Sequence, residues 1–184
     1  QFRANQAPHP IMTEYGIDAV PAQHELLDQW RMNFKGVKVE LEQYNLLISG
    51  AIDDLWVTPE NKYIIVDYKA TAKKDDMQEL GNKKWDDTYR RQMEIYQWLV
   101  RRNNLDVSNT GYFLYCNGIG FMDSFDKKLE FRTTLIEHVG DDSWIDDVIK
   151  NIYECLNSKE RPKPTDGCEF CEYISDIAAL NKHT

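Results

Sequence analysis

The chain has few cysteines, few histidines and no long hydrophobic run. Its 184 residues include only four Cys and four His. Four Cys in a chain of this size argue against a disulfide-stapled scaffold, which is typical of short secreted domains. No apolar run approaches the roughly 18 residues that indicate a membrane-spanning helix. Neither a signal-peptide pattern nor a low-complexity tract is present. These absences favour a soluble cytoplasmic protein with no membrane partner.

Length and composition are those of one globular domain. With 42% hydrophobic and 12% aromatic residues, the chain can bury a sizeable core. We expect one domain over residues 1–184, with an N-terminal arm over 1–20 and a Cys-x-x-Cys tail over 161–184. The first residue is Gln rather than Met, so the sequence leaves open whether the chain is a fragment.

Cations are scarcer than anions, and they are unevenly placed. The chain has 22 Lys and Arg against 31 Asp and Glu, a net charge of -9. From Lys69 to Arg102, however, the sequence contains nine Lys and Arg and six Asp and Glu, so this segment carries +3. Affinity for nucleic acid depends largely on cations that contact phosphates. The segment is therefore either the phosphate-binding part of the chain or a solubilising helix face.

Two carboxylates and one ammonium group are predicted to meet at the end of a sheet. In the strand Ile64-Ile65-Val66-Asp67-Tyr68-Lys69, side chains alternate, so Asp67 and Lys69 point the same way. The turn formers in Thr58-Pro59-Glu60-Asn61 predict a hairpin with the preceding strand. That hairpin sets Asp53 opposite Val66 or Asp67.

This arrangement has a direct chemical use. Magnesium prefers oxygen ligands, usually one or two carboxylates with water and substrate phosphate, which Asp53 and Asp67 would supply. Lys69 would orient or deprotonate the attacking water, or neutralise charge on a phosphate under attack. An Asp-x-Lys pair taken alone is also typical of an ordinary solvated strand face.

The longer pattern resembles a known nuclease family. Ser49-Gly50-Ala51-Ile52-Asp53, then Val66-Asp67-Tyr68-Lys69-Ala70-Thr71, then Gln92-Met93-Glu94-Ile95-Tyr96 look like the RecB-like branch of the PD-(D/E)XK nuclease superfamily. The resemblance covers about residues 37–116. It implies a restriction-endonuclease-like α/β core, a mixed β-sheet flanked by helices.

The resemblance also implies roles for particular residues. Asp53, Asp67 and the backbone carbonyl of Tyr68 would bind Mg²⁺ or Mn²⁺, Lys69 would assist the attacking water, and Gln92 and Tyr96 would border the site. RecB-like nucleases often carry a metal-binding His on a helix ahead of the Gly-x-x-Asp strand. His24 is the candidate for that role and His9 the weaker one; otherwise both are surface or packing residues.

Hydrophobic periodicity predicts the order of elements. We expect helices over 21–34, 85–102 and 141–156, and strands over 37–44, 46–57, 63–69, 110–116 and 128–139, the last at a sheet edge. Residues 1–20 read as a loop with one turn of helix, and 70–84 as a mobile connection with a short helix. The strands over 37–69 form a three-stranded meander, and a Pro-rich link begins at Arg161.

The tail carries Cys168 and Cys171 in a Cys-x-x-Cys pattern. Some RecB-like nucleases bind an iron-sulfur cluster here, with a third Cys soon after and a fourth far upstream. No Cys follows Cys171 and none precedes Cys116, which lies in a predicted core strand, while Cys155 lies on a predicted helix. We expect a two-Cys remnant, with zinc or a cluster completed by other ligands as the alternative.

The sequence thus predicts a Mg²⁺- or Mn²⁺-dependent deoxyribonuclease, a RecB-like exonuclease in DNA recombination, repair or phage or CRISPR-type processing. Its partners would be single- or double-stranded DNA and, by analogy, a helicase, recombinase or other nuclease-complex subunit. Three alternatives stay open. One is a catalytically silent DNA-binding or assembly module, another is a structural cation site in a non-nuclease, and the last is an RNA or modified-nucleotide substrate.

Overall fold

The structure, a computed structural model, describes residues 1–75, 77–81, 84–120, 127–160 and 162–180. Its helices are α1 (Phe2–Asn5), α2 (Pro10–Glu14), α3 (Leu27–Trp30), the 3-10 helix η1 (Glu42–Tyr44), α4 (Lys84–Arg102), α5 (Ile145–Asn157) and α6 (Glu169–Leu180). Its strands are β1 (Val20–Pro21), β2 (Val37–Leu41), β3 (Leu46–Gly50), β4 (Asp54–Val57), β5 (Tyr63–Thr71), β6 (Thr110–Gly118) and β7 (Phe131–Val139).

A mixed sheet forms the centre of the protein, as the sequence predicts for the α/β class. Within the described residues its strand order is β1-β4-β5-β6-β7, with β5 and β6 parallel and the other pairs antiparallel. Parallel neighbours need a crossover connection, and α4 supplies it between β5 and β6. The strands predicted over 63–69, 110–116 and 128–139 are confirmed as β5, β6 and the edge strand β7.

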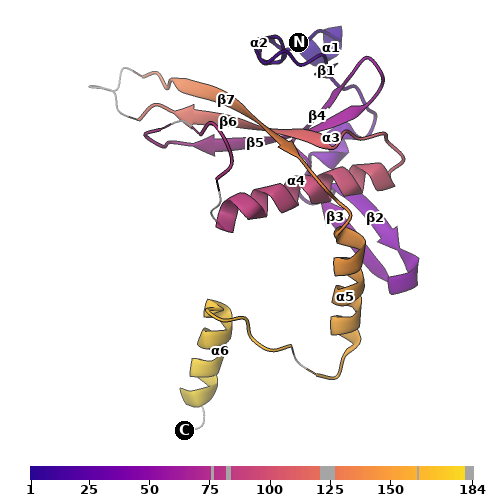
Figure 1. Cartoon of the computed structure of the whole chain (residues 1–184), viewed down its shortest axis with the longest axis vertical. Helices are drawn as coiled ribbons and strands as arrows, with labels where there is room; N and C mark the ends of the chain where they lie inside the picture. The colour runs from indigo at the N-terminus through magenta and orange to yellow at the C-terminus, as the bar shows by residue number, and fades with distance from the viewer. Residues whose placement is uncertain (76, 82–83, 121–126, 161, 181–184) are drawn as a thin grey trace. The chain divides into compact units, whose positions relative to one another are not determined.

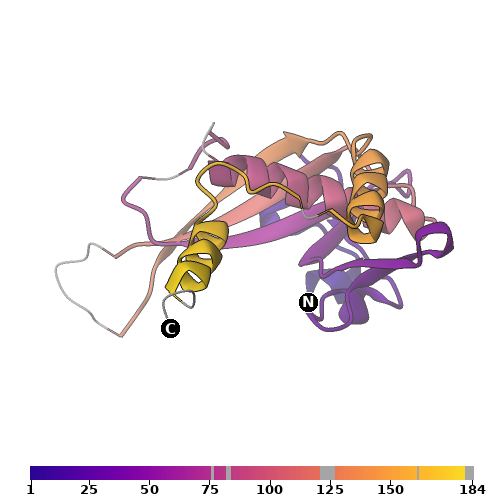
Figure 2. The same cartoon turned by 90° about the horizontal axis from the view of Figure 1, so that it is seen from below.

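The two faces of this sheet have different coverings. Figures 1 and 2 show α4 along one face and the N-terminal segment with α1 and α2 on the other. On the N-terminal side, a buried apolar cluster joins α2 to the strands; it contains Ile11, Met12, Ala19, Trp56, Ile64, Val66 and Leu135. On the α4 side Ile65, Phe113 and Met93 are fully buried. The central strand β5 is therefore fixed from both sides.

Helix α4 confirms the helix predicted over 85–102. Its first turn carries Asp86 and Asp87 and its last turn Arg101 and Arg102, charges that complement the helix dipole. The helix predicted over 141–156 is also confirmed, as α5. No helix is predicted for the tail, where α6 forms.

The helix predicted over 21–34 is wrong for most of its length. Only Leu27–Trp30 is helical. Upstream, Val20 and Pro21 pair with Val57 and Trp56 of β4, an edge position that tolerates proline. Backbone pairing with β4 therefore replaces the helical turn that the local pattern favours. The N-terminal arm is also more helical than the expected single turn, since α1 and α2 both form there.

The continuous strand predicted over 46–57 is also wrong. It divides into β3, which pairs with β2 in a separate hairpin, and β4, which pairs with β5. The expected three-stranded meander is therefore split between two sheets. Between the two strands, the backbone N–H of Ile52 donates to the carbonyl of Trp30 at 3.2 Å. The segment before Asp53 thus bonds to α3 instead of continuing a ladder.

The chain divides into two compact units, Gln1–Asp146 and Asp147–Thr184. Whether the whole chain acts as the one domain that its sequence predicts stays a prediction. No short helix occurs among the described residues of 72–81; Asp76, Asn82 and Lys83 of the predicted connection, and Arg161 of the Pro-rich link, lie outside the description. Among the residues described, no helix combines the length and apolar character needed to cross a membrane.

Candidate active site

Lys69 and Asp67 form an ion pair at the end of β5. Lys69 Nζ lies 2.7 Å from Asp67 Oδ2. Strand alternation puts both side chains on the α4 face of the sheet, as the sequence predicts. Asp67 is only 3% exposed, and the Lys69 side chain 16%. An ion pair this well shielded from water is held in place more firmly than a surface pair.

Asp53 approaches the same strand from the segment between β3 and β4. The ladder pairs Asp54 with Val66, so Asp53 lies one residue further along, beside Asp67 and Tyr68. Its Oδ2 accepts a hydrogen bond of 2.7 Å from the backbone N–H of Tyr68. The predicted hairpin therefore brings Asp53 to the end of β5 that carries Asp67 and Lys69.

Helix α4 supplies the third side of the site. Lys69 Nζ donates to Gln92 Oε1 at 2.8 Å, and Gln92 Nε2 donates to the hydroxyl of Tyr96 at 2.9 Å. Gln92 and Tyr96 are four residues apart and share a helix face. The ammonium group also lies 4.3 Å from the centre of the Tyr89 ring, within range for a cation–π contact. Lys69 is thus held by Asp67, Gln92 and Tyr89 together.

Burial and charge change the pKa values of this cluster. Burial raises the pKa of Asp67; Lys69 acts in the opposite direction, and the nearby Asp53 carboxylate adds to the increase. Burial also raises the pKa of Tyr96, against the hydrogen bond from Gln92, and both Asp67 and Asp53 increase it further. The three acidic groups are therefore close enough to interact electrostatically.

Two hollows open on either side of Lys69 and Tyr89. The larger is a groove of about 590 Å³, lined by Ser49, Gly50, Lys69, Thr88, Tyr89, Arg91, Gln92, Ile95 and Tyr96. The smaller, about 270 Å³, is lined by Lys69, Ala70, Thr71, Lys73, Met77, Trp85, Asp86, Tyr89 and Tyr115. Both combine cations with aromatic rings, a lining suited to phosphates and bases.

A comparison with protein families matches this chain to the PD-(D/E)XK nuclease superfamily over residues 6–175. The chain belongs to that superfamily. Membership implies nuclease activity, the hydrolysis of phosphodiester bonds; it also confirms the restriction-endonuclease-like fold. No curated protein and no solved structure matches the chain.

Members of the superfamily typically use divalent metals, and the donor atoms present fit such an ion. Asp67 Oδ2 is buried and, apart from its ion pair with Lys69, has no hydrogen-bond partner within the described residues. Two carboxylates and the Tyr68 carbonyl would form an all-oxygen set, which suits Mg²⁺ or Mn²⁺ with added waters. No group of three His, Cys, Asp or Glu residues suited to a metal occurs within the described ranges.

The structure places the two candidate histidines elsewhere. The ring of His24 stacks on Trp30 at 4.5 Å, and its Nδ1 accepts from the backbone N–H of Leu26. His9 caps α2, where its Nδ1 accepts from the N–H of Ile11. Neither is brought into a group with Asp53 and Asp67. In this structure the two side chains make packing and capping contacts, and a metal-binding role for His24 stays a prediction.

Sequence reasoning missed three residues around the site. Asp54, next to Asp53, is buried and forms an ion pair with Arg3 of α1; it also accepts a hydrogen bond from the Tyr68 hydroxyl. Because side chains alternate along a strand, Asp53 and Asp54 point to opposite faces, and this alternation could have indicated a separate role for Asp54. No sequence pattern indicated a role for Arg3, which lies in the segment expected to be a loop. Tyr89 is three residues before Gln92, so its helix spacing could have identified it.

The four cysteines are free. Cys116 lies in β6 and Cys155 on α5, as predicted. Cys168 directly precedes α6 and Cys171 lies in its first turn. A hydrogen bond with Cys171 lowers the pKa of the Cys168 thiol and raises that of Cys171. The two thiols of the tail are therefore adjacent, and the identity of any metal they would bind stays open.

Proposed function

We propose that the protein is a Mg²⁺- or Mn²⁺-dependent nuclease that hydrolyses the phosphodiester bonds of DNA. The observation that carries the proposal is the convergence of Asp53, Asp67, Lys69 and Gln92 at one end of β5, beside a groove with basic and aromatic walls. We assign it to the RecB-like exonucleases of DNA recombination, repair or phage and CRISPR-type processing, working in the cytoplasm with a helicase, recombinase or other nuclease subunit.

Each residue has a task in this reaction. Asp53, Asp67 and the Tyr68 carbonyl would hold the metal, which supplies an activated water and neutralises phosphate charge. Lys69 stabilises the negative charge that develops on the phosphate, or orients the attacking water. Gln92 fixes the position of the Lys69 ammonium group, and the Tyr96 hydroxyl fixes Gln92. The Tyr68 N–H keeps Asp53 directed at the site.

The experiment is a cleavage assay on end-labelled linear single-stranded, double-stranded and circular DNA, with labelled RNA alongside. It is run in Mg²⁺, Mn²⁺ or chelator with the wild type, Asp67→Asn and Lys69→Ala. Lys62→Ala is the matched control, because Lys62 is exposed in the turn just before β5. We expect metal-dependent DNA cleavage that only Asp67→Asn and Lys69→Ala abolish.

The pattern of substrates separates the finer alternatives. Sparing of circles assigns an exonuclease, and cleavage of circles an endonuclease. Preferential cleavage of RNA contradicts the DNA assignment. A wild type that binds DNA but cuts no substrate contradicts the catalytic assignment and leaves a silent DNA-binding module.

A further inference from the structure

A fully exposed phenylalanine lies on the loop that follows α3. The side chain of Phe34 is 100% exposed, whereas burial of such a ring would stabilise a fold by roughly 1.5–3 kcal/mol. The loop around it is nevertheless well defined, since the backbone N–H groups of Lys35 and Gly36 both donate to the carbonyl of Met32 at 2.9 Å. A ring held on an ordered turn, outside the core, is free to contact a partner molecule.

Both ends of this loop are fixed against the segment that carries Asp53. At its start, the Trp30 carbonyl accepts a hydrogen bond from Ile52. At its end, Gly36 adopts φ +61 and packs so closely on Gly50 that an added Cβ would lie 2.6 Å from the Gly50 carbonyl oxygen. Gly50 in turn lines the active-site groove. The loop is therefore anchored on a residue that lines that groove, although its own residues do not line it.

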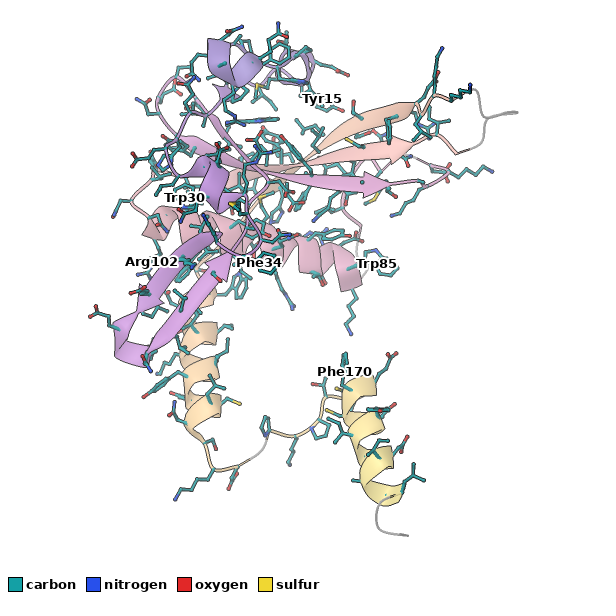
Figure 3. The ribbon with its side chains drawn as sticks, turned by 180° about the vertical axis from the view of Figure 1, so that it is seen from behind. Tyr15, Trp30, Phe34, Trp85, Arg102 and Phe170 are labelled. Atoms are coloured by element: carbon teal, nitrogen blue, oxygen red, sulfur yellow. The ribbon has the colours of Figure 1, made fainter. Side chains whose placement is uncertain are left out.

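Electrostatics place the loop near β5, the strand that carries the site. Burial, and then the Asp54 carboxylate, raise the pKa of Tyr68, while Arg31 acts on it in the opposite direction. Arg31 is thus within charge-interaction range of the Tyr68 hydroxyl, which alternation along β5 directs away from Asp67 and Lys69 and towards Asp54. Figure 3 shows Phe34 and Trp85 on the α4 side of the sheet, and Tyr15 on the other side.

The loop also carries a local positive charge, although the chain as a whole is acidic. From Gln29 to Val39 the sequence contains Arg31, Lys35 and Lys38 and no Asp or Glu, although the chain as a whole carries -9. This charge complements a phosphate backbone. In a duplex the flat faces of bases are covered by their neighbours, so a protruding ring stacks best on an unpaired base.

We propose that the loop Arg31–Lys35 binds the unpaired strand of the nucleic-acid substrate, with Phe34 stacked on a base and Arg31 and Lys35 on the flanking phosphates. This inference rests on the proposed nuclease function and specifies its substrate class as an end with a single strand. The loop belongs to none of the three motifs that mark the superfamily in the sequence.

The test measures binding in chelator, where cleavage cannot interfere. Fluorescence anisotropy follows a labelled oligothymidylate and a blunt-ended duplex, each with the wild type, Phe34→Leu and Phe34→Trp. Loss of one stacked base is expected to weaken single-strand binding by about ten-fold in Phe34→Leu, with duplex binding unchanged. Phe34→Trp keeps an aromatic face and is expected to keep the affinity.

Salt dependence separates stacking from charge. The slope of log K against log salt is expected to decrease by about 0.7 for each phosphate-binding cation removed, so by about 1.4 in the double variant Arg31→Gln with Lys35→Gln. The slope is expected to stay unchanged in Phe34→Leu. The control is Phe170→Leu, which removes another exposed ring and is expected to leave binding unchanged.

The outcomes distinguish the inference from the proposed function. A protein that cuts DNA, yet binds single strands equally well after Phe34→Leu, overturns this inference alone. An equal loss in Phe170→Leu shows a general effect of exposed rings and also overturns it. A wild type that neither binds nor cuts any strand overturns the proposed function and this inference with it.

Discussion

The hydroxyl of Tyr68 donates a 2.6 Å hydrogen bond to Oδ2 of Asp54, while the backbone N–H of the same tyrosine holds Asp53. One residue of β5 thus contacts two consecutive acids that serve different purposes. Asp53 faces the candidate metal site, and Asp54 is buried with Arg3 and stabilises the fold. Stability and activity are therefore separable at this position.

The first prediction concerns Tyr68→Phe. Asp54 loses one hydrogen bond but keeps Arg3 and the N–H of Leu55, so the free energy of unfolding is expected to fall by about 1–2 kcal/mol. Because the bond to Asp53 comes from the backbone, metal affinity is expected to be retained. Urea denaturation and metal titration measure the two effects. Tyr173→Phe, whose side chain is exposed, serves as the unchanged control; loss of metal binding without loss of stability would contradict this account.

The second prediction concerns Gln92→Ala. Without the amide oxygen, the Lys69 ammonium group loses its hydrogen bond to α4 and keeps only the contact with the Tyr89 ring of that helix. The cleavage rate under single-turnover conditions is expected to fall roughly 10- to 100-fold, as for other residues that orient an active-site group. Tyr96→Phe is expected to have a smaller effect, because its hydroxyl reaches Lys69 only through Gln92. Gln43→Ala, an exposed position, provides the control, and a rate equal to that of wild type in Gln92→Ala would disprove the positioning role.

The third prediction is that Mg²⁺ or Mn²⁺ raises the thermal unfolding midpoint. At a concentration about 100 times its Kd, a ligand stabilises the folded state by about 2.7 kcal/mol. Asp53→Asn and Asp67→Asn are expected to remove this shift, and the exposed Asp18→Asn to keep it. Differential scanning calorimetry with metal and with chelator makes the comparison; an equal shift in all variants would place metal binding elsewhere.

The fourth prediction is that metal stabilisation and folding stability depend on pH, because the pKa of Asp67 is raised. Burial keeps Asp67 protonated to a pH above its ordinary value of 3.8, and a protonated carboxyl is a poor metal ligand. Metal stabilisation is therefore expected to disappear as pH falls through that raised pKa. Without metal, the folded state binds more protons than the unfolded state between 3.8 and the raised value, so stability is expected to decrease as pH rises through this interval. Asp67→Asn is expected to remove that decrease, and a wild-type stability independent of pH there would contradict it.

The fifth prediction concerns the tail. If Cys168 and Cys171 are a two-Cys remnant, the double variant Cys168→Ser with Cys171→Ser keeps wild-type cleavage and thermal stability. Elemental analysis of the wild-type protein is then expected to find no stoichiometric zinc or iron. Loss of a bound metal together with loss of activity would establish the alternative, a site completed by other ligands.

The sequence by itself determined the centre of the site. Alternation in β5 put Asp67 and Lys69 on one face, the four-residue spacing put Gln92 and Tyr96 on another, and the turn before Tyr63 brought Asp53 to them. These are short-range relations, set by the geometry of one strand, one helix and one hairpin. The strands and the helix around them were predictable for the same reason.

The arrangement of the segments around the site was decided only by the tertiary structure. Residues 21–34 follow a helical pattern, yet Val20 and Pro21 pair with β4, because backbone pairing with a distant strand outweighs a weak local preference. The break at Gly50, the partnership of Asp54 with Arg3, and the packing of Gly36 on Gly50 each depend on contacts between segments far apart in the chain. No periodicity within one segment encodes such contacts, since they are formed only when the segments pack together.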